Sequence, residues 1–227
     1  MKTLRMLFCA LLIAAALCAA ATAEVAPGDA MPDFSAMAAD GRETTLSSLL
    51  DNHDMVLICL LPSPNEIEAP ILPDEDRIGT LLLRFDEPEG AALAEALGVT
   101  VPPACAVVDR FGTLCYLGPV PDSEALFAQL TEPLLATDYA ESVLLSAYAV
   151  RFADQNGDPV ADVLCQVCDE FSCSLYSSDA DGACAFILPS RDYEIHILRA
   201  PDGYAFDDVA ASVPASGGET AFLLERQ

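Results

Sequence analysis

Cysteine has the widest chemical scope of any residue type in this sequence, because its thiols can form disulfides, bind metals or act as nucleophiles. The chain of 227 residues has nine cysteines, and Cys168 and Cys173 flank a segment of hairpin-loop size. Residues that face each other on paired strands come close to disulfide distance. We therefore predict a disulfide between Cys168 and Cys173.

Two further cysteines, Cys165 and Cys184, each share a strand face with apolar residues, so both should point into a core. This pattern predicts a second disulfide, between Cys165 and Cys184. Zinc held by Cys165, Cys168, Cys173 and Cys184 is the alternative. Strand residues three apart point to opposite sides, which weighs against zinc and against a redox Cys-x-x-Cys at Cys165 and Cys168.

The other candidate polar sites have simpler interpretations. His53 lies in a polar loop and His196 on the polar face of a strand, and neither is placed to be a base for Ser or Cys. The Asp179-x-Asp181-Gly182 pattern resembles the middle of a calcium loop, but Leu188 occupies the position of its final acid. We expect a β-turn there, with weak Ca²⁺ binding as the alternative. We predict no cofactor.

The charge of the chain restricts its partners. Lys+Arg total 10 and Asp+Glu total 36, a net charge of −26, while apolar residues make up 53%. This composition indicates a folded protein, and its field repels the phosphates of nucleic acids and anionic membranes. We expect the partner to be an unidentified protein or peptide, and a basic one suits the charge.

The first 23 residues have the pattern of a secretory signal peptide. Lys2 and Arg5 precede an apolar run, and Ala21-Thr22-Ala23 forms a small-x-small cleavage site. We expect a secreted or extracytoplasmic envelope protein without a membrane span after cleavage. Cleavage would leave seven cysteines, an odd number, so at least one thiol would be free or paired between molecules.

Hydrophobic periodicity divides the rest into two parts. Residues 24–136 combine a continuous apolar run, Met55–Leu61, with helical patterns at 87–97 and 123–135, which predicts an α/β domain. Residues 137–146 are expected to be a linker. Residues 147–227 contain short strands separated by Gly-containing turns, which predicts an all-β antiparallel sandwich.

Ordered short motifs give the first part a resemblance. They are Gly28-Asp29, Pro32-Asp33-Phe34, Asp40-Gly41, Gly98-Val99, Pro102-Pro103, Val107-Val108-Asp109, Gly112 and Gly118. Together they resemble extracytoplasmic thioredoxin-like redoxins related to alkyl hydroperoxide reductase and thiol-disulfide oxidoreductases. The resemblance implies that Pro103 is the cis-proline beside the active site.

The same resemblance places Asn65 and Glu68 where the family has its Cys-x-x-Cys pair. Asn and Glu cannot exchange disulfides, so the resemblance implies a ligand groove formed by Asn65, Glu68 and Pro103 without the catalytic dithiol. Cys59, Cys105 and Cys115 are located within strands. We expect them to be buried as small apolar residues, with Cys59 facing Cys105 at most as a structural pair.

The second part resembles a different family. The turns at Asp154–Pro159, Asp179–Gly182 and Pro201–Tyr204 resemble prealbumin-like sandwiches of the collagen-adhesin B (Cna-B) or carboxypeptidase-regulatory type. Many such adhesin repeats contain a Lys–Asn isopeptide bond. Lys2 is the only lysine of this chain, so that crosslink is excluded.

The sequence thus favours an exported, redox-inactive, thioredoxin-like binding or scaffold protein of the cell envelope over an enzyme. One alternative is a thiol-disulfide or peroxide oxidoreductase that uses Cys168 and Cys173. A second is an acidic adhesin-like surface protein. Fold resemblance alone does not decide among them.

Overall fold

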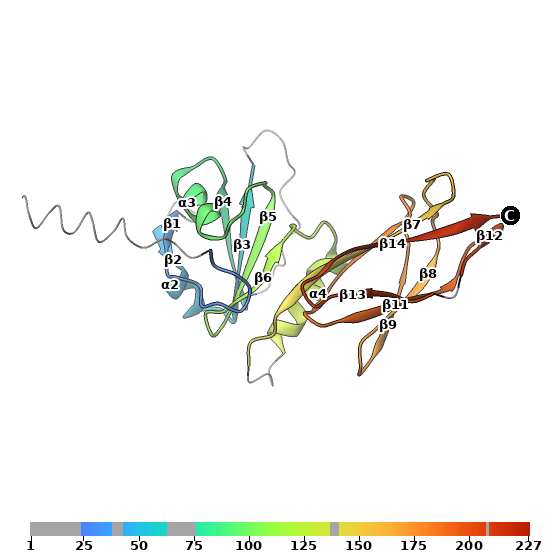
Figure 1. Ribbon diagram of the computed structural model, residues 1–227. Helices are drawn as coiled ribbons and strands as arrows, with labels where there is room; N and C mark the ends of the chain where they lie inside the picture. Colours follow the sequence, from blue (N-terminus) through green and yellow to red (C-terminus); the bar gives the residue numbers. More distant parts are fainter. Residues whose placement is uncertain (1–23, 38–42, 63–75, 137–140, 208) are drawn as a thin grey trace, which may run out of the picture.

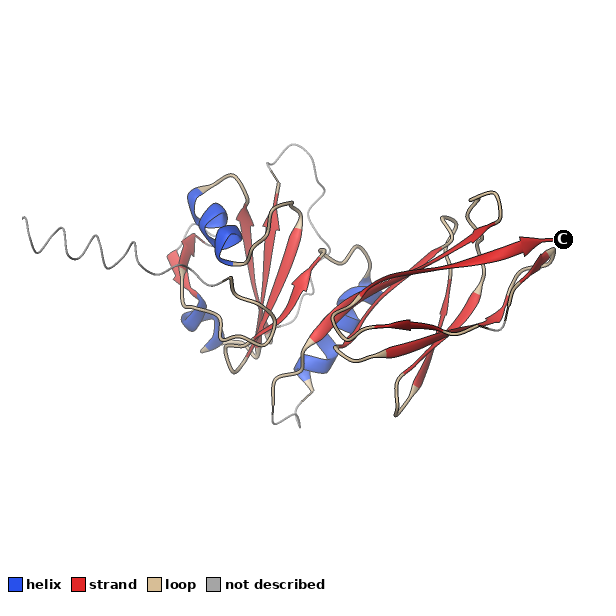
Figure 2. Ribbon diagram, in the orientation of Figure 1, coloured by secondary structure: helices blue, strands red, loops and turns tan. Residues whose placement is uncertain are grey.

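A computed structural model describes residues 24–37, 43–62, 76–136, 141–207 and 209–227. The predicted signal peptide, residues 1–23, lies outside the described residues. The described chain consists mostly of β-sheets with few helices (Figure 2). In this part of the chain, no helix is long and apolar enough to cross a membrane.

The N-terminal part is built on a four-stranded sheet in the order β4-β3-β5-β6. Strand β3 pairs in parallel with β4 and antiparallel with β5. The prediction of a buried central strand at Met55–Leu61 is confirmed, because β3 has these bounds and only its last residue is partly exposed. A small hairpin of β1 and β2 lies outside this sheet. The strands are β1 (Ser35–Met37), β2 (Glu43–Thr45), β3 (Met55–Leu61), β4 (Ile78–Arg84), β5 (Ala104–Asp109) and β6 (Leu114–Gly118).

Three helices accompany this sheet: α2 (Leu46–Leu50), α3 (Pro88–Ala96) and α4 (Glu124–Leu135). Local capping explains where two of them begin. The side chain of Thr45 accepts a hydrogen bond from the backbone of Ser48, and Ser123 accepts one from Leu126. The predicted helices at 87–97 and 123–135 are therefore confirmed to within a residue at each end.

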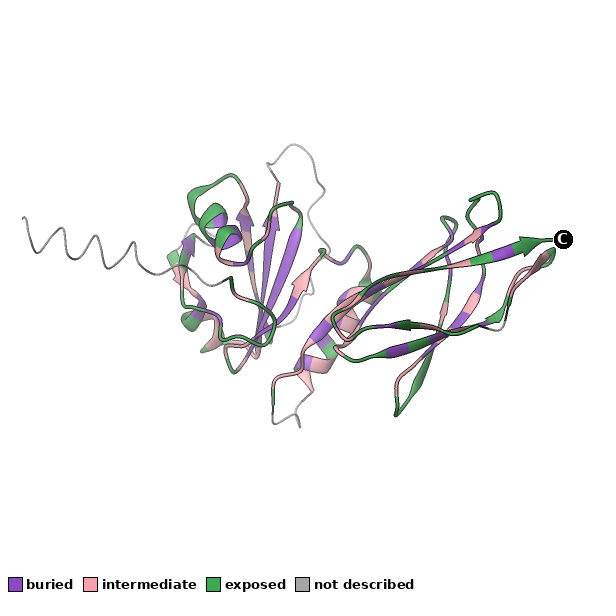
Figure 3. Ribbon diagram, viewed as in Figure 1, coloured by how far each residue is buried: buried purple, intermediate pink, exposed green. Residues whose placement is uncertain are grey.

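The C-terminal part consists of two four-stranded sheets, in the orders β10-β7-β14-β12 and β13-β11-β8-β9. Their facing sides share one apolar core, so the sheets form a sandwich. Buried and exposed residues alternate along the strands (Figure 3). The strands are β7 (Leu145–Asp154), β8 (Leu164–Cys168), β9 (Cys173–Ser177), β10 (Ala183–Pro189), β11 (Tyr193–Arg199), β12 (Tyr204–Ala205), β13 (Ala211–Val213) and β14 (Gly218–Arg226).

The expectation of a purely antiparallel sandwich is wrong at one strand. Strand β14 pairs in parallel with β7, with Phe222 opposite Phe152. The reason is topological: the chain crosses from β13 in one sheet to β14 in the other, and it arrives in the direction of β7.

Among the residues that the structure describes, three turns share one arrangement of hydrogen bonds. In each, an aspartate Oδ1 accepts hydrogen bonds from the N–H groups two and four residues later, at 2.8–3.0 Å. The aspartates are Asp109, Asp154 and Asp179. The glycine three residues after each aspartate has a positive φ of 68–86°, which a Cβ would disfavour. In the β-turn that we predicted at Asp179, the Asp179 Oδ1 atom therefore accepts hydrogen bonds from backbone N–H groups.

Helix α4 joins the two parts through a common core. Its residues Phe127, Leu130 and Leu134 pack in one buried cluster with Leu145 of β7 and Ile187 of β10. Figure 1 shows α4 beside the sandwich. Because Leu145 is a buried strand residue, β7 begins inside the predicted linker 137–146, of which residues 137–140 lie outside the described residues.

This shared core generates a prediction. Leu130 is fully buried, so Leu130→Ala should lower the free energy of unfolding by about 2–5 kcal/mol. As a control, Leu223→Ala removes a side chain that is 75% exposed and should change it by less than about 0.5 kcal/mol. Denaturant unfolding measures both, and equal effects would contradict this packing.

Candidate functional site

A disulfide closes the hairpin between β8 and β9. Cys168 and Cys173 are directly opposite each other in the register, and their sulfur atoms are bonded, as predicted. The loop between them is also held internally, because Asp169 Oδ1 accepts hydrogen bonds from the N–H groups of Phe171 at 2.9 Å and Ser172 at 2.7 Å. We call this unit, residues 168–173, the clamp.

Arg191, in the turn between β10 and β11, contacts two residues of the clamp. Its Nη1 lies 2.9 Å from Asp169 Oδ2, and its guanidinium lies 5.2 Å from the centre of the Phe171 ring. The hydrogen bonds from Phe171 and Ser172, and that from Arg191, hold the pKa of the Asp169 carboxyl below its usual value. The clamp is therefore a positioned structure rather than a free loop tip.

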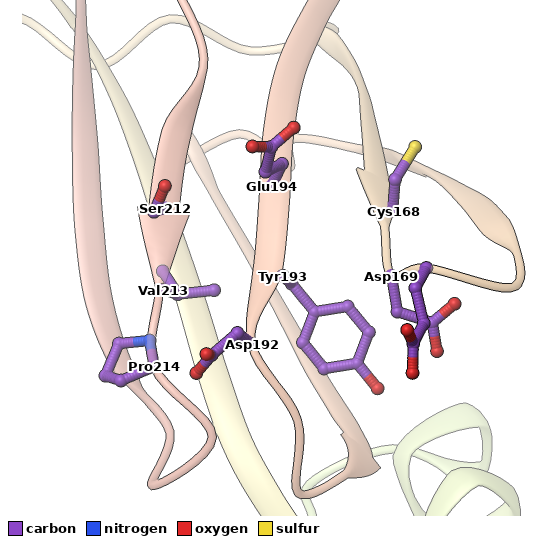
Figure 4. A pocket seen from close by; sticks show the side chains of 9 residues that line it. Cys168, Asp169, Asp192, Tyr193, Glu194, Ser212, Val213 and Pro214 are labelled. Carbon is purple, nitrogen blue, oxygen red and sulfur yellow. The ribbon is translucent and has the colours of Figure 1, made fainter.

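Beside the clamp is an open hollow of about 640 Å³. Three segments line it: the end of β8 with its loop, the start of β11, and the end of β13. Figure 4 shows the Tyr193 side chain between the carboxylates of Asp192 and Asp169. We call it the acidic hollow, and its lining residues are Cys168, Asp169, Glu170, Asp192, Tyr193, Glu194, Ser212, Val213 and Pro214.

The polar groups of the acidic hollow differ in how firmly they are held. Asp192 Oδ1 accepts a hydrogen bond from the N–H of Ala215 at 2.9 Å. The Tyr193 hydroxyl donates to the carbonyl of Pro189 at 2.9 Å, and burial raises its pKa to about 12, so it stays protonated. Glu194 extends on the exposed face, 3.7 Å from His196 Nε2. The carboxylates among these groups can attract a cationic ligand.

The second predicted disulfide, between Cys165 and Cys184, is not formed. The two Sγ atoms lie 3.8 Å apart and both thiols are free. The thiols come from β8 and β10 in opposite sheets and meet across the core as packing neighbours, at a separation well beyond the S–S bond length of about 2.05 Å. The contact with Cys165, together with burial, raises the pKa of Cys184.

The three cysteines of the N-terminal sheet, Cys59, Cys105 and Cys115, are fully buried and free, as predicted. Cys59 is the register partner of Cys105, and its hydrogen bond raises the pKa of the Cys105 thiol, as does burial. Burial raises the pKa of Cys115 to about 12, with a further contribution from Asp109. Because a raised pKa disfavours the thiolate, neither Cys105 nor Cys115 is activated as a nucleophile.

Of the three residues of the predicted ligand groove, the structure describes Pro103. Asn65 and Glu68 lie outside the described residues. The Pro102–Pro103 peptide bond is cis, as the resemblance implied, and Pro103 is exposed immediately before β5. Pro103 does not line the acidic hollow.

Sequence reasoning missed most of the acidic hollow. Ser212 and Pro214 were not candidates, because β13 spans only three residues and has no clear period. Asp192 lies in the turn before β11 and was not a candidate either. The alternation of Asp192 and Glu194 around the start of β11 was the available signal. Among the described residues, no group of three or more His, Cys, Asp or Glu side chains is arranged to hold a metal ion.

Comparisons with known proteins do not assign a family. No family model and no curated protein matches the chain. Among solved structures, a putative protein disulfide isomerase from Bacteroides thetaiotaomicron is 25% identical, with 48% of this chain and 87% of that chain covered and a TM-score of 0.34. The thioredoxin domain of a thiol-disulfide oxidoreductase from Bacteroides vulgatus is 12% identical, with 49% and 99% covered and a TM-score of 0.34.

The BcpA major pilin subunit of Bacillus cereus is 13% identical, with 37% of this chain covered and a TM-score of 0.32. This chain spans 29% of the length of that pilin. These likenesses, to thioredoxin-like oxidoreductases and to a pilin, are partial and too low in TM-score to carry an argument about function.

The hydrogen bonding of Asp169 predicts a pH response. Because its folded pKa lies below the ordinary value of 3.8, its contribution to stability is present above that value and is lost as pH falls through the folded pKa. Amide exchange at Phe171 and Ser172, corrected for intrinsic rates, should therefore accelerate in acid. In Asp169→Asn this acid response should disappear, and an unchanged response would contradict the assignment.

Proposed function

We propose that this chain is an exported, redox-inactive binding protein, with a thioredoxin-like N-terminal domain and a prealbumin-like C-terminal sandwich. Its acidic hollow binds a basic segment of a partner protein of the cell envelope. The observation that carries the proposal is the placement of Glu170, Asp192 and Glu194 around one hollow beside the clamp, whose Asp169 is paired with Arg191.

The rigidity of the hollow supports binding. The disulfide and the contacts of Arg191 hold one wall, and the hydrogen bond to Asp192 holds another. A site that is ordered before binding loses less conformational entropy when its ligand arrives. The net charge of −26 adds long-range attraction for a basic partner.

The state of the sulfur atoms supports a function without thiol catalysis. In the described chain, Cys168 and Cys173 are bonded to each other, and the remaining five cysteines are buried. A catalytic cysteine needs an accessible thiolate, stabilised for example by a helix N-terminus. Cys168 and Cys173 are located on strands.

Binding of a basic peptide tests the proposal. The probe is a fluorescent heptapeptide of alternating arginine and valine, and its affinity should fall as salt rises. The double variant Glu170→Gln/Glu194→Gln should bind about three- to tenfold more weakly, because each partly exposed charge contributes about 0.2–1 kcal/mol.

A matched control for charge is Glu89→Gln/Glu225→Gln, which removes two exposed carboxylates outside the hollow. Its effect on affinity should be less than twofold. Equal weakening by both double variants would show that peptide affinity depends only on the net charge of the protein, and would contradict a site at the hollow.

The oxidoreductase alternative makes the opposite prediction about turnover. Cys173 is exposed, so a reductant can reach the disulfide. We expect no acceleration of insulin reduction over dithiothreitol alone. Acceleration that is lost in Cys168→Ser would favour the redox alternative, whereas acceleration that survives this substitution would locate redox activity elsewhere in the chain.

A further inference from the structure

Strand β9 forms an outer edge of the sandwich without the protection that the other edges have. In the described chain its one strand partner is β8. At the edge of the other sheet, β10 is covered by α4, and Gln129 Oε1 accepts a hydrogen bond from the N–H of Ile187 at 2.8 Å. The remaining outer strands, β12 and β13, have only two and three residues.

The register shows which backbone groups of β9 point outward. In antiparallel pairs, narrow pairs without mutual hydrogen bonds alternate with wider hydrogen-bonded pairs. The Cα atoms of Cys168 and Cys173 are 4.0 Å apart, so this pair is narrow. The backbone N–H and C=O groups of Cys173, Leu175 and Ser177 therefore point away from β8.

The side chains of β9 do not prevent another strand from pairing with this edge. Its sequence, Cys-Ser-Leu-Tyr-Ser, has no lysine, proline or inward-pointing charge, which are the usual protections of edge strands. Leu175 is 61% exposed and Phe171 in the adjoining loop is 74% exposed. The clamp fixes one end of the strand, so the edge is already extended and ordered.

The surrounding charge selects the kind of partner. Glu170 precedes β9, and Asp179 and Asp181 follow it, and all three are exposed. A second copy of this chain would bring another charge of −26 and the same carboxylates to the edge, which is unfavourable. A basic segment would place cationic side chains near these carboxylates while an apolar side chain contacts Leu175.

We propose that β9 binds an extended basic segment of a partner protein by strand addition, which extends the sheet β13-β11-β8-β9 by one strand. This inference rests on the proposed function and adds how the partner is held. Main-chain hydrogen bonds from Cys173, Leu175 and Ser177 would supply direction, and the acidic hollow would supply charge attraction.

Backbone methylation of the peptide tests the proposal without altering the protein. Alternate N–H groups of an added strand face the same side. Of two arginine-valine heptapeptides, N-methylated at every valine or at every arginine, one should bind more than tenfold more weakly and the other within threefold of the unmodified peptide. Equal effects of the two methylation patterns would overturn strand addition.

A protein variant tests the same edge. Leu175→Pro removes an outward N–H group, a change that edge strands tolerate, and should weaken binding more than tenfold. Leu175→Val keeps the N–H group and should stay within threefold. Peptide mapping of the Cys168–Cys173 disulfide and circular dichroism check that both variants fold. If Leu175→Pro does not fold, the methylated peptides alone test strand addition.

The outcomes separate this inference from the proposed function. If Glu170→Gln/Glu194→Gln weakens binding but Leu175→Pro and methylation do not, the acidic hollow stands and strand addition is overturned. If the wild-type chain does not bind the unmodified peptide at low salt, both are overturned. Dimerisation that Leu175→Pro abolishes would identify a second copy as the occupant and overturn the basic partner.

Discussion

The pairing of β8 on both of its sides is the constraint on which the C-terminal architecture depends. Strand β8 lies between β11 and β9, so its backbone is fully engaged and its side chains can only alternate between the core and the surface. Cys165 and Val167 enter the core, and Cys168 is thereby placed on the outer face opposite Cys173. A shift of one residue would reverse every one of these placements.

The clamp, the acidic hollow and the free edge all follow from that register. The disulfide can form because Cys168 meets Cys173, and the hollow lies where the loop after β8 approaches the start of β11. The narrow Cys168–Cys173 pair also determines which backbone groups of β9 face solvent. At the edge of the other sheet, α4 covers β10 and connects the sandwich to the N-terminal sheet, and the edge strand β13 has only three residues, so β9 is the longer edge that is open to a partner.

What the sequence could predict was local. The strand Met55–Leu61 matched because a continuous apolar run indicates burial directly. The Cys168–Cys173 bond was accessible because a hairpin brings nearby residues together. The non-local features could not be predicted in this way. The Cys165–Cys184 prediction failed because periodicity shows that both thiols point into the core but does not give the distance between them. The parallel pairing of β14 and the joining of Asp192 to Pro214 in one hollow depend on chain crossings.

The two parts of the binding site have different physical ranges, and this makes them complementary. Charge attraction from the hollow acts over about 8 Å at physiological ionic strength and carries little information about the shape of a ligand. Hydrogen bonds along β9 act only at contact, but they require an extended backbone in register. Since the edge itself is uncharged, raising the salt concentration should weaken the first contribution and spare the second, so the affinity that persists at high salt measures the strand edge.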